Sequence, residues 1–515
     1  MITMPLPVAS SVAPSYVPRL SLWSHQQDAL AKLMDHRNFA LFMEMRTGKT
    51  ATILAEFGNL VAELRLDSLL VVAPAGVYRV WDADARKHLA ADLRGKTKIH
   101  IWSAADHDGA VTEIMSWRGP RILLVNVEAL SSVKRVRQLC ADYLKQRPAM
   151  MVIDESTAVK NPRAKRTKFI VDVLAPLAAR RRILSGLPTP QSPLDLYAQF
   201  AFLNPRILNY PSFTGFRARY TNLKRVPFGP GGTMIDIVTG YKNLDELAAT
   251  IAPHSFRVRL EDCYDLPPKI YMRREVAMTV EQRRIYDELR DYATACLGNE
   301  ERVTATMVLT AVLRLHQVLC GHTTSDDGTE MVIKENRTDE LLQIIEDQPV
   351  DRKAIIWVSY DHDVTKVARA LAMAYDPACV VYSLFGEERS ERREPKFPSG
   401  IVARFWGGNV DTREEEERRF KEDPRCRFMV ATPSSGGRGR TWDGANLVVY
   451  YSNTWNLEHR LQSEERPQAV GKTTSVAYVD LICPGTVEEK IVAALREKIN
   501  IAAVIAGDDY REWLI

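Results

Sequence analysis

Residues 39–50, Phe-Ala-Leu-Phe-Met-Glu-Met-Arg-Thr-Gly-Lys-Thr, join a short apolar run to a Gly-Lys-Thr turn. The apolar run predicts a buried strand, and residues 51–57 repeat apolar side chains at helical spacing. Gly48 is therefore expected where a strand turns into a helix. Such a junction suits phosphate binding, because glycine lets the backbone approach a phosphate and the helix start offers free N–H groups. Lys49 would reach the outer phosphates of a nucleotide, and Thr50 would ligate Mg²⁺.

Only the last part of the phosphate-loop pattern is present. The full pattern has a glycine five residues before Gly48, and this chain has Met43 there. The same tripeptide recurs at Gly471-Lys472-Thr473, between a polar helical stretch and a strand-like run, and we assign no function to that copy. The strand-to-helix setting favours phosphate binding by the first copy over an ordinary turn.

Composition limits the class of protein. A chain of 515 residues is too long for one hydrophobic core and predicts about two to four domains. Its 46% hydrophobic and 26% charged residues are typical of globular proteins and exclude collagenous or disordered ones. The small net charge of +4 means that a nucleic-acid surface would need local clustering of basic residues.

The apolar runs, the first residues and the cysteines bear on where the protein acts. No uncharged apolar run approaches the roughly 20 residues of a membrane-spanning helix. Residues 1–18 contain neither basic residues nor a long apolar core, so we expect a short, loosely held tail on a cytoplasmic protein without membrane contact. The seven cysteines are dispersed, which favours a reducing compartment over a zinc site.

Strand-like runs alternate with helical ones along the first part of the chain. After the run at Phe39, they begin at Leu69, Lys98, Ile122, Met150 and Arg182. This alternation predicts a parallel sheet with helices on both faces, whose ligands lie at the carboxyl ends of the strands. Unusual residues fall at those ends: Pro74-Ala75-Gly76, Asn126-Val127-Glu128, Asp154-Glu155-Ser156-Thr157 and Ser185-Gly186-Leu187-Pro188.

Asp154 and Glu155 are the most informative of these residues. Two carboxylates directly after an apolar strand are costly unless something compensates their charge. Mg²⁺ held by Asp154 would do so, and Glu155 would then orient or deprotonate the attacking water. The alternative is a helix N-terminus, where acidic residues are common. The phosphate loop expected in the same sheet favours the metal site.

The alternation stops between Arg206 and Pro268. Aromatic residues, a Gly- and Pro-rich cluster and Phe256-Arg257-Val258-Arg259 indicate an irregular insertion and a linker, with helices after them. From Thr338 a second α/β pattern begins, without a phosphate loop of its own. Its strands are expected from Ala354, Cys379, Arg427, Leu447 and Val476.

Several motifs, in the correct order, resemble those of the Swi/Snf-type ATPases of helicase superfamily two. Residues 154–161 and 184–205 resemble motifs II and III, and residues 432–439 and 462–471 resemble motifs V and VI. Trp81 fits motif Ia, and Gln26 falls where the family has its adenine-reading glutamine, although alone it would be read as a surface polar residue. The resemblance covers roughly residues 20–500.

The resemblance implies an α/β protein with two RecA-like parallel-sheet lobes in tandem and helical insertions between them. The expected parts are a flexible tail at 1–18, an ATP-binding first lobe at 19–205, a protrusion, linker and helical insertion at 206–337, a second lobe at 338–498 and a C-terminal tail at 499–515.

The resemblance also implies an ATP hydrolase that uses Mg²⁺ and translocates on double-stranded DNA without separating its strands. ATP would bind between the lobes, and closure on ATP followed by opening would move the DNA. The implied catalytic residues are Lys49, Asp154, Glu155 and Arg466, and the implied metal ligands are Thr50 and Asp154. The implied nucleotide contacts are Gln26, Thr47, Gly48, Lys49, Thr50, Gly437, Gln462 and Arg466. The implied nucleic-acid contacts, sequence-independent and salt-sensitive, are Pro74, Gly76, Asn126, Lys160, Ser359, Thr432 and Trp455.

The match fails at three positions. The second motif VI arginine of the family, its arginine finger, falls on Ala469, and such a finger strongly accelerates phosphoryl transfer. Arg46 replaces a motif I glycine, and Thr441 stands where motif V usually has asparagine. Arg438 and Arg440 are candidate substitutes for the finger.

Alternatives remain open at this point. Ala469 is the reason to keep an ATP-gated DNA clamp with weak or no turnover, and an RNA or single-strand helicase of the same superfamily is the other alternative. An α/β protein without an ATPase role would make the motif order a coincidence. The compact chain suggests a monomeric bacterial or phage protein of replication, recombination or repair, with a recruiting protein that the sequence does not identify.

Overall fold

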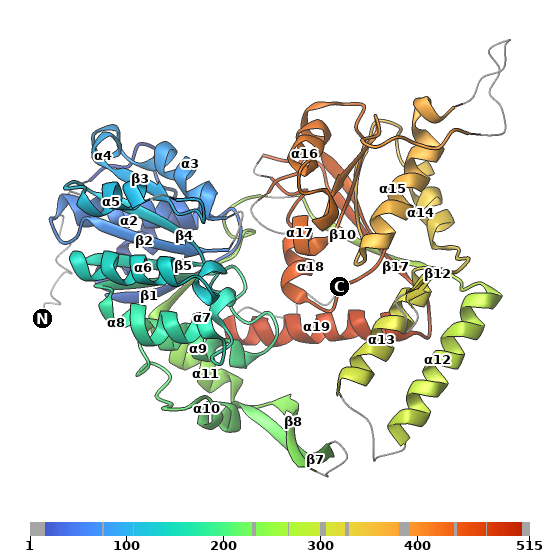
Figure 1. Cartoon of the computed structure of the whole chain (residues 1–515), viewed down its shortest axis with the longest axis horizontal. Coiled ribbons are helices and arrows are strands. Elements are labelled where there is room, and N and C mark those ends of the chain that lie inside the picture. Colours follow the sequence, from blue (N-terminus) through green and yellow to red (C-terminus); the bar gives the residue numbers. More distant parts are fainter. Residues whose placement is uncertain are drawn as a thin grey trace, which may run out of the picture. The chain divides into compact units, whose positions relative to one another are not determined.

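The computed structural model describes residues 16–74, 77–106, 108–228, 233–265, 267–298, 305–324, 329–380, 392–436, 440–469 and 471–506. The chain divides into two compact units (Figure 1). The first comprises residues 1–220, 242–263 and 502–509, and the second comprises residues 221–241, 264–501 and 510–515.

The first unit is built on a parallel sheet. Over the described residues it has seven strands in the order β3-β4-β2-β5-β6-β1-β9. The strands are β1 (Asn38–Met43), β2 (Ser68–Ala73), β3 (Lys98–Ile101), β4 (Arg121–Asn126), β5 (Ala149–Asp154), β6 (Arg180–Leu184) and β9 (Ser255–Val258). The central strands are apolar along their whole length because a parallel sheet is covered on both faces.

The helices of the first unit cover both faces of this sheet. The longer ones are α1 (Ser24–Asp35), α2 (Lys49–Ala62), α3 (Tyr78–His88), α4 (Ala91–Lys96), α5 (Asp108–Ser116), α6 (Lys134–Gln146), α9 (Leu196–Leu203), α10 (Phe213–Tyr220) and α11 (Leu244–Ile251). The short ones are η1 (Ala129–Ser131), η2 (Ser156–Val159), α7 (Lys165–Lys168), η3 (Phe169–Leu174), α8 (Ala175–Leu177), η4 (Pro193–Asp195) and η5 (Ala252–His254). Trp81 of α3 packs in one core with Leu41, whereas Phe200 of α9 meets Phe42. Since neighbouring strand residues point to opposite faces, α3 and α9 lie on opposite faces (Figure 1).

A buried ion pair ties the first helices to the sheet. Glu56 of α2 and Arg182 of β6 are both fully buried, and Arg182 Nε donates to Glu56 Oε2 over 3.0 Å. Arg182 also donates to the backbone carbonyls of Leu33, His36 and Arg37, each at 2.8 Å. The connection between α1 and β1 is therefore held rigidly against β6.

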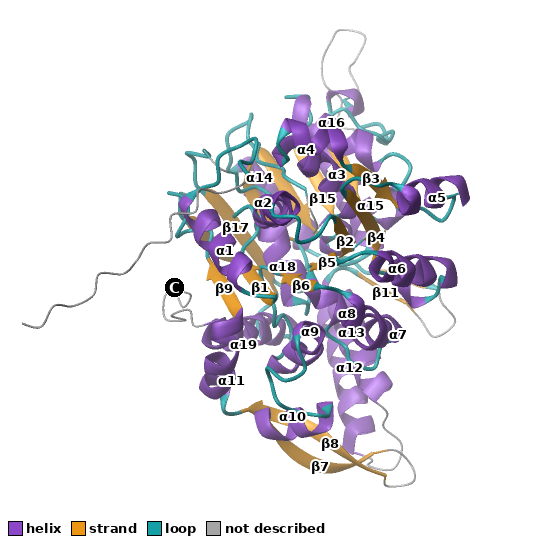
Figure 2. Cartoon of the chain, turned by 90° about the vertical axis from the view of Figure 1, so that its left-hand side faces the viewer, coloured by secondary structure: helices purple, strands orange, loops and turns teal. Residues whose placement is uncertain are grey.

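The second unit has a parallel sheet of its own. In the described part it has six strands in the order β10-β17-β16-β13-β15-β14. They are β10 (Lys269–Glu275), β13 (Lys353–Trp357), β14 (Val402–Phe405), β15 (Phe428–Ala431), β16 (Ala445–Tyr450) and β17 (Val476–Ile482). Antiparallel pairs are formed by β7 (Thr221–Phe228) with β8 (Thr233–Tyr241), seen as a separate ribbon in Figure 2, and by β11 (His322–Thr324) with β12 (Glu330–Val332).

The helices of the second unit are α12 (Val280–Gly298), α13 (Ala305–Leu319), α14 (Arg337–Glu346), α15 (Asp361–Tyr375), η6 (Pro377–Cys379), η7 (Gly407–Asn409), α16 (Arg413–Glu422), α17 (Pro433–Gly436), α18 (Leu457–Glu464) and most of α19 (Val487–Ala506), whose last residues, 502–506, are assigned to the first unit. Two units, each built on a parallel sheet with helices, confirm the expected fold class. Among the described residues, no helix combines the length and apolar character that crossing a bilayer requires.

Seven of the described strands were not expected, three of them in the two parallel sheets, and the strand expected from Cys379 does not begin there. Ser255–Val258, placed in an irregular insertion, instead forms β9 beside β1. The strands β10 and β14 were also missed, whereas Cys379 belongs to a 3₁₀ turn; residues 381 and 382 of that expected strand lie outside the described residues. β9 and β10 are edge strands with mixed or exposed side chains, so they lack the apolar run that marks a central strand.

Candidate functional site

The loop between β1 and α2 has the backbone of a tight turn. Gly48 precedes α2 with φ of 86°, in the left-handed region that favours glycine. A Cβ on Gly48 would come 2.1 Å from Gln26 Nε2. Thr47 is fully buried, and its hydroxyl donates to the Glu44 carbonyl over 2.8 Å, which closes the loop on itself. The backbone conformation thus favours glycine here, and a larger residue would have to displace the Gln26 amide.

Lys49 folds back over this loop. Its ammonium donates to the backbone carbonyls of Met43, at 2.7 Å, and Glu44, at 3.0 Å. These carbonyls mark the carboxyl end of β1, so the positive charge lies at the edge of the sheet where ligands of parallel α/β folds bind. The expected position of Lys49 at a strand-to-helix junction is confirmed.

Gln26 and its neighbour hold the loop from α1. The Gln26 side chain is 7% exposed, donates from Nε2 to the Thr47 carbonyl over 3.1 Å and accepts from the Trp23 backbone N–H over 3.1 Å. His25 Nε2 donates to the same carbonyl over 2.9 Å. The interpretation of Gln26 as a surface polar residue is therefore wrong, and its amide lies directly against the glycine of the loop.

The missed strand β9 also supports the loop. Glu44 accepts hydrogen bonds from Arg257 Nη2 and from the backbone N–H of Leu260, each over 2.9 Å. The Glu44 backbone N–H in turn donates to the Val258 carbonyl over 3.0 Å. A segment that sequence patterns left irregular thus fixes the start of the loop.

Asp154 ends β5 and is 6% exposed. Trp81 Nε1 donates to its Oδ2 over 2.8 Å, and the Glu155 backbone N–H donates to its Oδ1 over 3.0 Å. Burial raises the pKa of Asp154, and the Trp81 hydrogen bond and the charge of Lys49 oppose that rise. Lys49 and Asp154 are therefore near enough to interact, although they are 105 positions apart in the sequence.

Glu155 follows in a left-handed conformation, with φ of 48°. A non-glycine residue with positive φ is uncommon and is found often at functional sites. The side chain of Glu155 is half-buried, beside the carboxylate of Asp154. The pair of carboxylates expected after the fifth strand is thus present at the carboxyl edge of the sheet.

A third carboxylate at this site was missed by the sequence analysis. Asp84 lies three residues after Trp81 on α3, so both side chains share one face of that helix. Burial raises the pKa of Asp84, as does the charge of Asp154, while Lys87 and a hydrogen bond from Thr50 lower it. The three-residue spacing after Trp81 was the signal that could have identified it.

These residues suit Mg²⁺ as well as a nucleotide. The Asp154 carboxylate, the Thr50 hydroxyl and the nearby Asp84 carboxylate are oxygen donors, the kind that Mg²⁺ prefers. Mg²⁺ in nucleotide sites takes only one or two protein ligands, with waters and phosphate oxygens as the others. A buried carboxylate whose charged form is disfavoured by burial would be stabilised by such a cation.

The expected nucleic-acid contacts of the first unit lie at the same edge of its sheet. Pro74 follows β2, Asn126 ends β4 and Lys160 follows η2 after β5. Asn126 Oδ1 accepts from the Glu128 backbone N–H over 2.7 Å, and Lys160 Nζ lies 3.9 Å from an Asp195 oxygen. Gly76 lies outside the described residues.

The expected contacts of the second unit follow three neighbouring strands of its sheet. Ser359 follows β13, Thr432 follows β15 and Trp455 follows β16, where it is 40% exposed. The Ser359 backbone N–H donates to Ser452 Oγ over 2.7 Å. These residues therefore lie at the carboxyl edge of the sheet. Gly437, expected to contact the nucleotide, lies outside the described part of the chain.

The motif VI residues lie inside the second unit. Gln462 of α18 is 7% exposed, and its Nε2 donates to Glu458 Oε1 over 3.4 Å. Arg466 is fully buried and donates from Nη1 to the Arg440 carbonyl. Ala469 is half-buried.

The candidate finger substitutes have different outcomes. Arg440 donates to the Glu417 carboxylate, and its guanidinium lies 4.6 Å from the centre of the Phe405 ring. Arg440 is therefore held within the second unit. Arg438 lies outside the described residues.

Curated proteins similar to this chain are identical to it at about a quarter of the aligned positions. The TATA-binding protein-associated factor MOT1 of Saccharomyces cerevisiae is 24% identical over 69% of this chain and 20% of its own length. The SWI/SNF-related matrix-associated actin-dependent regulator of chromatin subfamily A-like protein 1 of Xenopus tropicalis is 23% identical over 97% of this chain and 48% of its own. The putative ATP-dependent helicase/translocase YwqA of Bacillus subtilis is 24% identical over 88% and 45%. The chain thus spans between a fifth and about half of the length of these relatives.

Among solved structures, the Sulfolobus solfataricus SWI2/SNF2 ATPase core in complex with dsDNA is 23% identical, with 97% of this chain and 96% of that chain covered and a TM-score of 0.41. The sequence profile of the SNF2-related domain matches residues 22–324, which is more than half of the chain. The chain therefore belongs to the SNF2-related family.

Proposed function

We propose that this chain is a DNA-dependent ATPase that translocates on double-stranded DNA. The observation that carries the proposal is the meeting of Lys49, Thr50 and Asp154 at the carboxyl edge of one parallel sheet, with Trp81 holding the Asp154 carboxylate. Family membership supports the same activity, as does the Bacillus subtilis relative whose name describes a putative ATP-dependent helicase/translocase. The lobe boundaries at 19–205 and 338–498 stay predictions.

The loop residues would bind the phosphates of ATP. The Lys49 ammonium would exchange its two backbone carbonyl partners for phosphate oxygens, and the first free N–H groups of α2 would donate to the same ligand. Gln26, which lies against the loop, would read the adenine edge with an amide that both donates and accepts. Binding and orientation of the triphosphate are thus assigned to the strand-to-helix junction.

The acidic residues would act on the terminal phosphate. Thr50 and Asp154 would hold Mg²⁺, which neutralises negative charge that develops on the phosphates during transfer. Glu155 would orient the attacking water and accept its proton. Its left-handed backbone turns it away from the strand direction, and the Asp154 carboxylate is kept in place by Trp81 and by the Glu155 N–H.

Contacts to DNA would come from the carboxyl edges of both sheets. Asn126 and Lys160 in the first unit, and Thr432 and Trp455 in the second, would contact the backbone of the duplex. Contacts to phosphates give no information about the base sequence, and they release counterions from the DNA. Binding would therefore be sequence-independent and salt-sensitive. Closure of the two units on ATP and their opening after hydrolysis would then move the duplex.

A second candidate function is an ATP-gated DNA clamp with weak or no turnover. Ala469 cannot contact a phosphate, and the fully buried Arg466 is engaged by the Arg440 carbonyl. Arg440 is itself paired with Glu417. In this function ATP binding would change the affinity for DNA without repeated hydrolysis.

Displacement of a third strand from a DNA triplex tests the translocase against these alternatives. Movement along a duplex removes the third strand without separating the other two. We expect ATP-dependent displacement by the natural chain and none by Glu155→Gln. Displacement that is absent in both, with ATP-dependent DNA binding retained, would establish the clamp, and unwinding of single-strand-tailed DNA or RNA would establish the helicase.

A further inference from the structure

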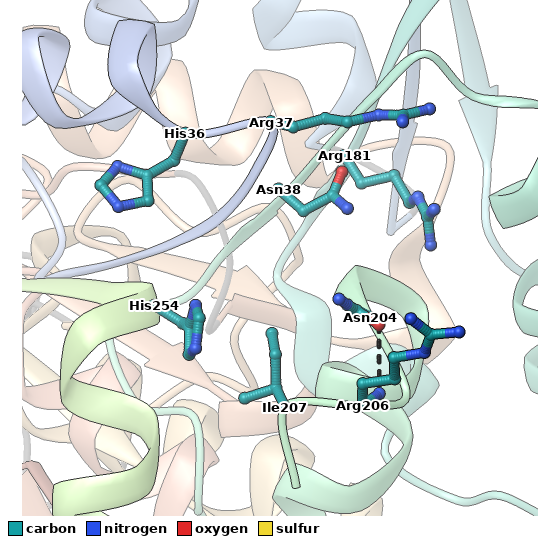
Figure 3. A pocket seen from close by; sticks show the side chains of 8 residues that line it. All are labelled: His36, Arg37, Asn38, Arg181, Asn204, Arg206, Ile207 and His254. Atoms are coloured by element: carbon teal, nitrogen blue, oxygen red, sulfur yellow. Dashed lines mark hydrogen bonds between the residues drawn. The ribbon is translucent and has the colours of Figure 1, made fainter. Parts of the chain in front are cut away.

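A hollow in the first unit lies at the opposite edge of the sheet from the phosphate loop. Asn38 begins β1, Arg181 is the second residue of β6, and His254 directly precedes β9. Parallel strands that are neighbours begin at the same edge, so these residues meet at the amino edge of the sheet. The hollow has a volume of about 410 Å³, and we call it the amino-edge pocket (Figure 3).

The lining of the amino-edge pocket carries positive charge without negative charge. It contains Arg37, Arg181, Arg206, His36 and His254, together with two asparagines and an isoleucine, and no carboxylate. Within the described residues, none of the three arginines forms an ion pair with an acidic side chain. In Figure 3 the three guanidinium groups lie on one side of the view and the two imidazoles on the other.

The arginines are held in place but keep donors to spare. Arg37 Nε donates to the Ala179 carbonyl, and Arg181 Nη1 donates to the Phe202 carbonyl, each over 2.9 Å. Each guanidinium has five N–H donors, so most remain available. Arg181 Nε is buried without a hydrogen-bond partner in the described part of the chain. A buried donor left unsatisfied destabilises the protein, and a ligand that accepts from it would remove that cost.

The protein brings these like charges together. Burial lowers the pKa of Arg181, and the charge of Arg37 lowers it further. Burial likewise lowers the pKa of His254, with an added effect of His36. The like charges stay close together because the buried Arg182 donates to the backbone carbonyls of His36 and Arg37 and so fixes that segment. An anion in the pocket would relieve the repulsion.

We propose that the amino-edge pocket binds a phosphate group. Guanidinium groups match the planar edges of oxyanions, and arginine is the preferred residue for bidentate phosphate contacts. Here the guanidinium groups come from three segments: the connection between α1 and β1, strand β6 and the turn after α9. Three guanidinium groups offer more donors than the two oxygens of a carboxylate can accept from, whereas a phosphate has several free oxygens. The phosphate comes either from a free phosphate compound or from a nucleic-acid backbone.

The proposal is independent of the ATPase, and its test is made on the full chain with Lys49→Ala, so that the phosphate loop does not contribute. The pocket variant is Arg37→Ala with Arg206→Ala, since both side chains are exposed at the rim. The charge-matched control is Lys96→Ala with Lys145→Ala, two exposed lysines of α4 and α6. Thermal unfolding verifies folding, and Arg206→Gln alone replaces the double variant if that variant unfolds.

Two probes distinguish the sources of the phosphate. Inorganic pyrophosphate is titrated by calorimetry, and linear duplex DNA by fluorescence anisotropy over a series of salt concentrations. For a free phosphate compound, we expect pyrophosphate to bind at least about tenfold more weakly to the pocket variant and unchanged to the control. For a nucleic-acid backbone, we expect the plot of the logarithm of the DNA-binding constant against the logarithm of salt concentration to become less steep in the pocket variant. Its slope should change by up to about 1.8, because each lost phosphate contact removes about 0.9.

Either result supports the phosphate pocket and names its source. If the pocket variant and the lysine control bind both probes equally well, the proposal is wrong. That outcome leaves the ATPase proposal untouched, because the phosphate loop is inactivated in every protein compared.

Discussion

Replacing Trp81 by phenylalanine removes one hydrogen bond from the candidate metal site and keeps most of the buried ring. The Trp81 indole donates to Asp154 Oδ2 over 2.8 Å, and Asp154 is 6% exposed. If Asp154 holds Mg²⁺, the indole acts as the partner that orients the metal ligand. Trp81→Phe should therefore weaken the use of Mg²⁺ more than it weakens the fold.

The structure sets the size of this effect. A hydrogen bond to a charged group contributes about 1.5–3 kcal/mol. Because about 1.4 kcal/mol corresponds to a tenfold change, loss of this bond should weaken Mg²⁺ binding about 10- to 150-fold. The same range, about 10–100-fold, is typical when the partner of a metal ligand is removed.

The assay is ATP hydrolysis as a function of Mg²⁺ concentration, at fixed ATP and saturating duplex DNA. The control is Trp102→Phe, which truncates another buried tryptophan of the first unit, away from Asp154. We expect the Mg²⁺ concentration for half-maximal rate to rise at least about tenfold in Trp81→Phe and to stay unchanged in the control. Equal Mg²⁺ requirements in the two variants would refute the assigned role of Trp81.

Four further variants, the last of them a control, test other parts of the first unit. Asp84→Asn removes the carboxylate next to the phosphate loop, and we expect ATP turnover to fall about tenfold with little change in thermal unfolding; unchanged turnover would exclude Asp84 from the site. Gly48→Ala places a Cβ 2.1 Å from Gln26 Nε2 at a φ of 86°, so we expect a loss of about 1–2 kcal/mol in unfolding free energy together with weaker binding of a fluorescent ATP analogue; normal binding would contradict this account of the loop. Glu56→Gln leaves buried arginines without their partner and should cost about 3–5 kcal/mol in urea denaturation. Glu63→Gln, which breaks an exposed ion pair, should change the unfolding free energy by no more than about 0.5 kcal/mol. Equal losses in the two glutamate variants would contradict the expectation that loss of a buried partner costs more than loss of an exposed one.

The central strands of both sheets could be predicted from sequence because burial on both faces leaves a continuous apolar run. Ser68–Ala73 and Ala149–Asp154 are buried at every position, and both were expected. The edge strand β10 has no such run, since six of its seven residues are exposed. The pairing of β10 with β17 is decided by contacts far away in the sequence, which a local pattern does not contain.

Site residues were predictable where one short segment carries the chemistry. The Gly-Lys-Thr turn and the Asp154-Glu155 pair can each be recognised from a few consecutive residues. The structure brings both to one edge of the sheet. The support of the loop by Glu44 and β9 was not predictable, because it depends on tertiary pairing. The amino-edge pocket could not be predicted for the same reason. Its residues come from separate segments that meet only through the strand order β6-β1-β9.

Steady-state ATP hydrolysis with and without linear duplex DNA tests the central claim most directly, with Glu155→Gln as the inactive control. The account predicts strong stimulation by duplex DNA that is absent in Glu155→Gln, which would also show that the alanine at position 469 is compensated. Binding of ATP without turnover above the Glu155→Gln level, on duplex, single-stranded DNA and RNA alike, would contradict it.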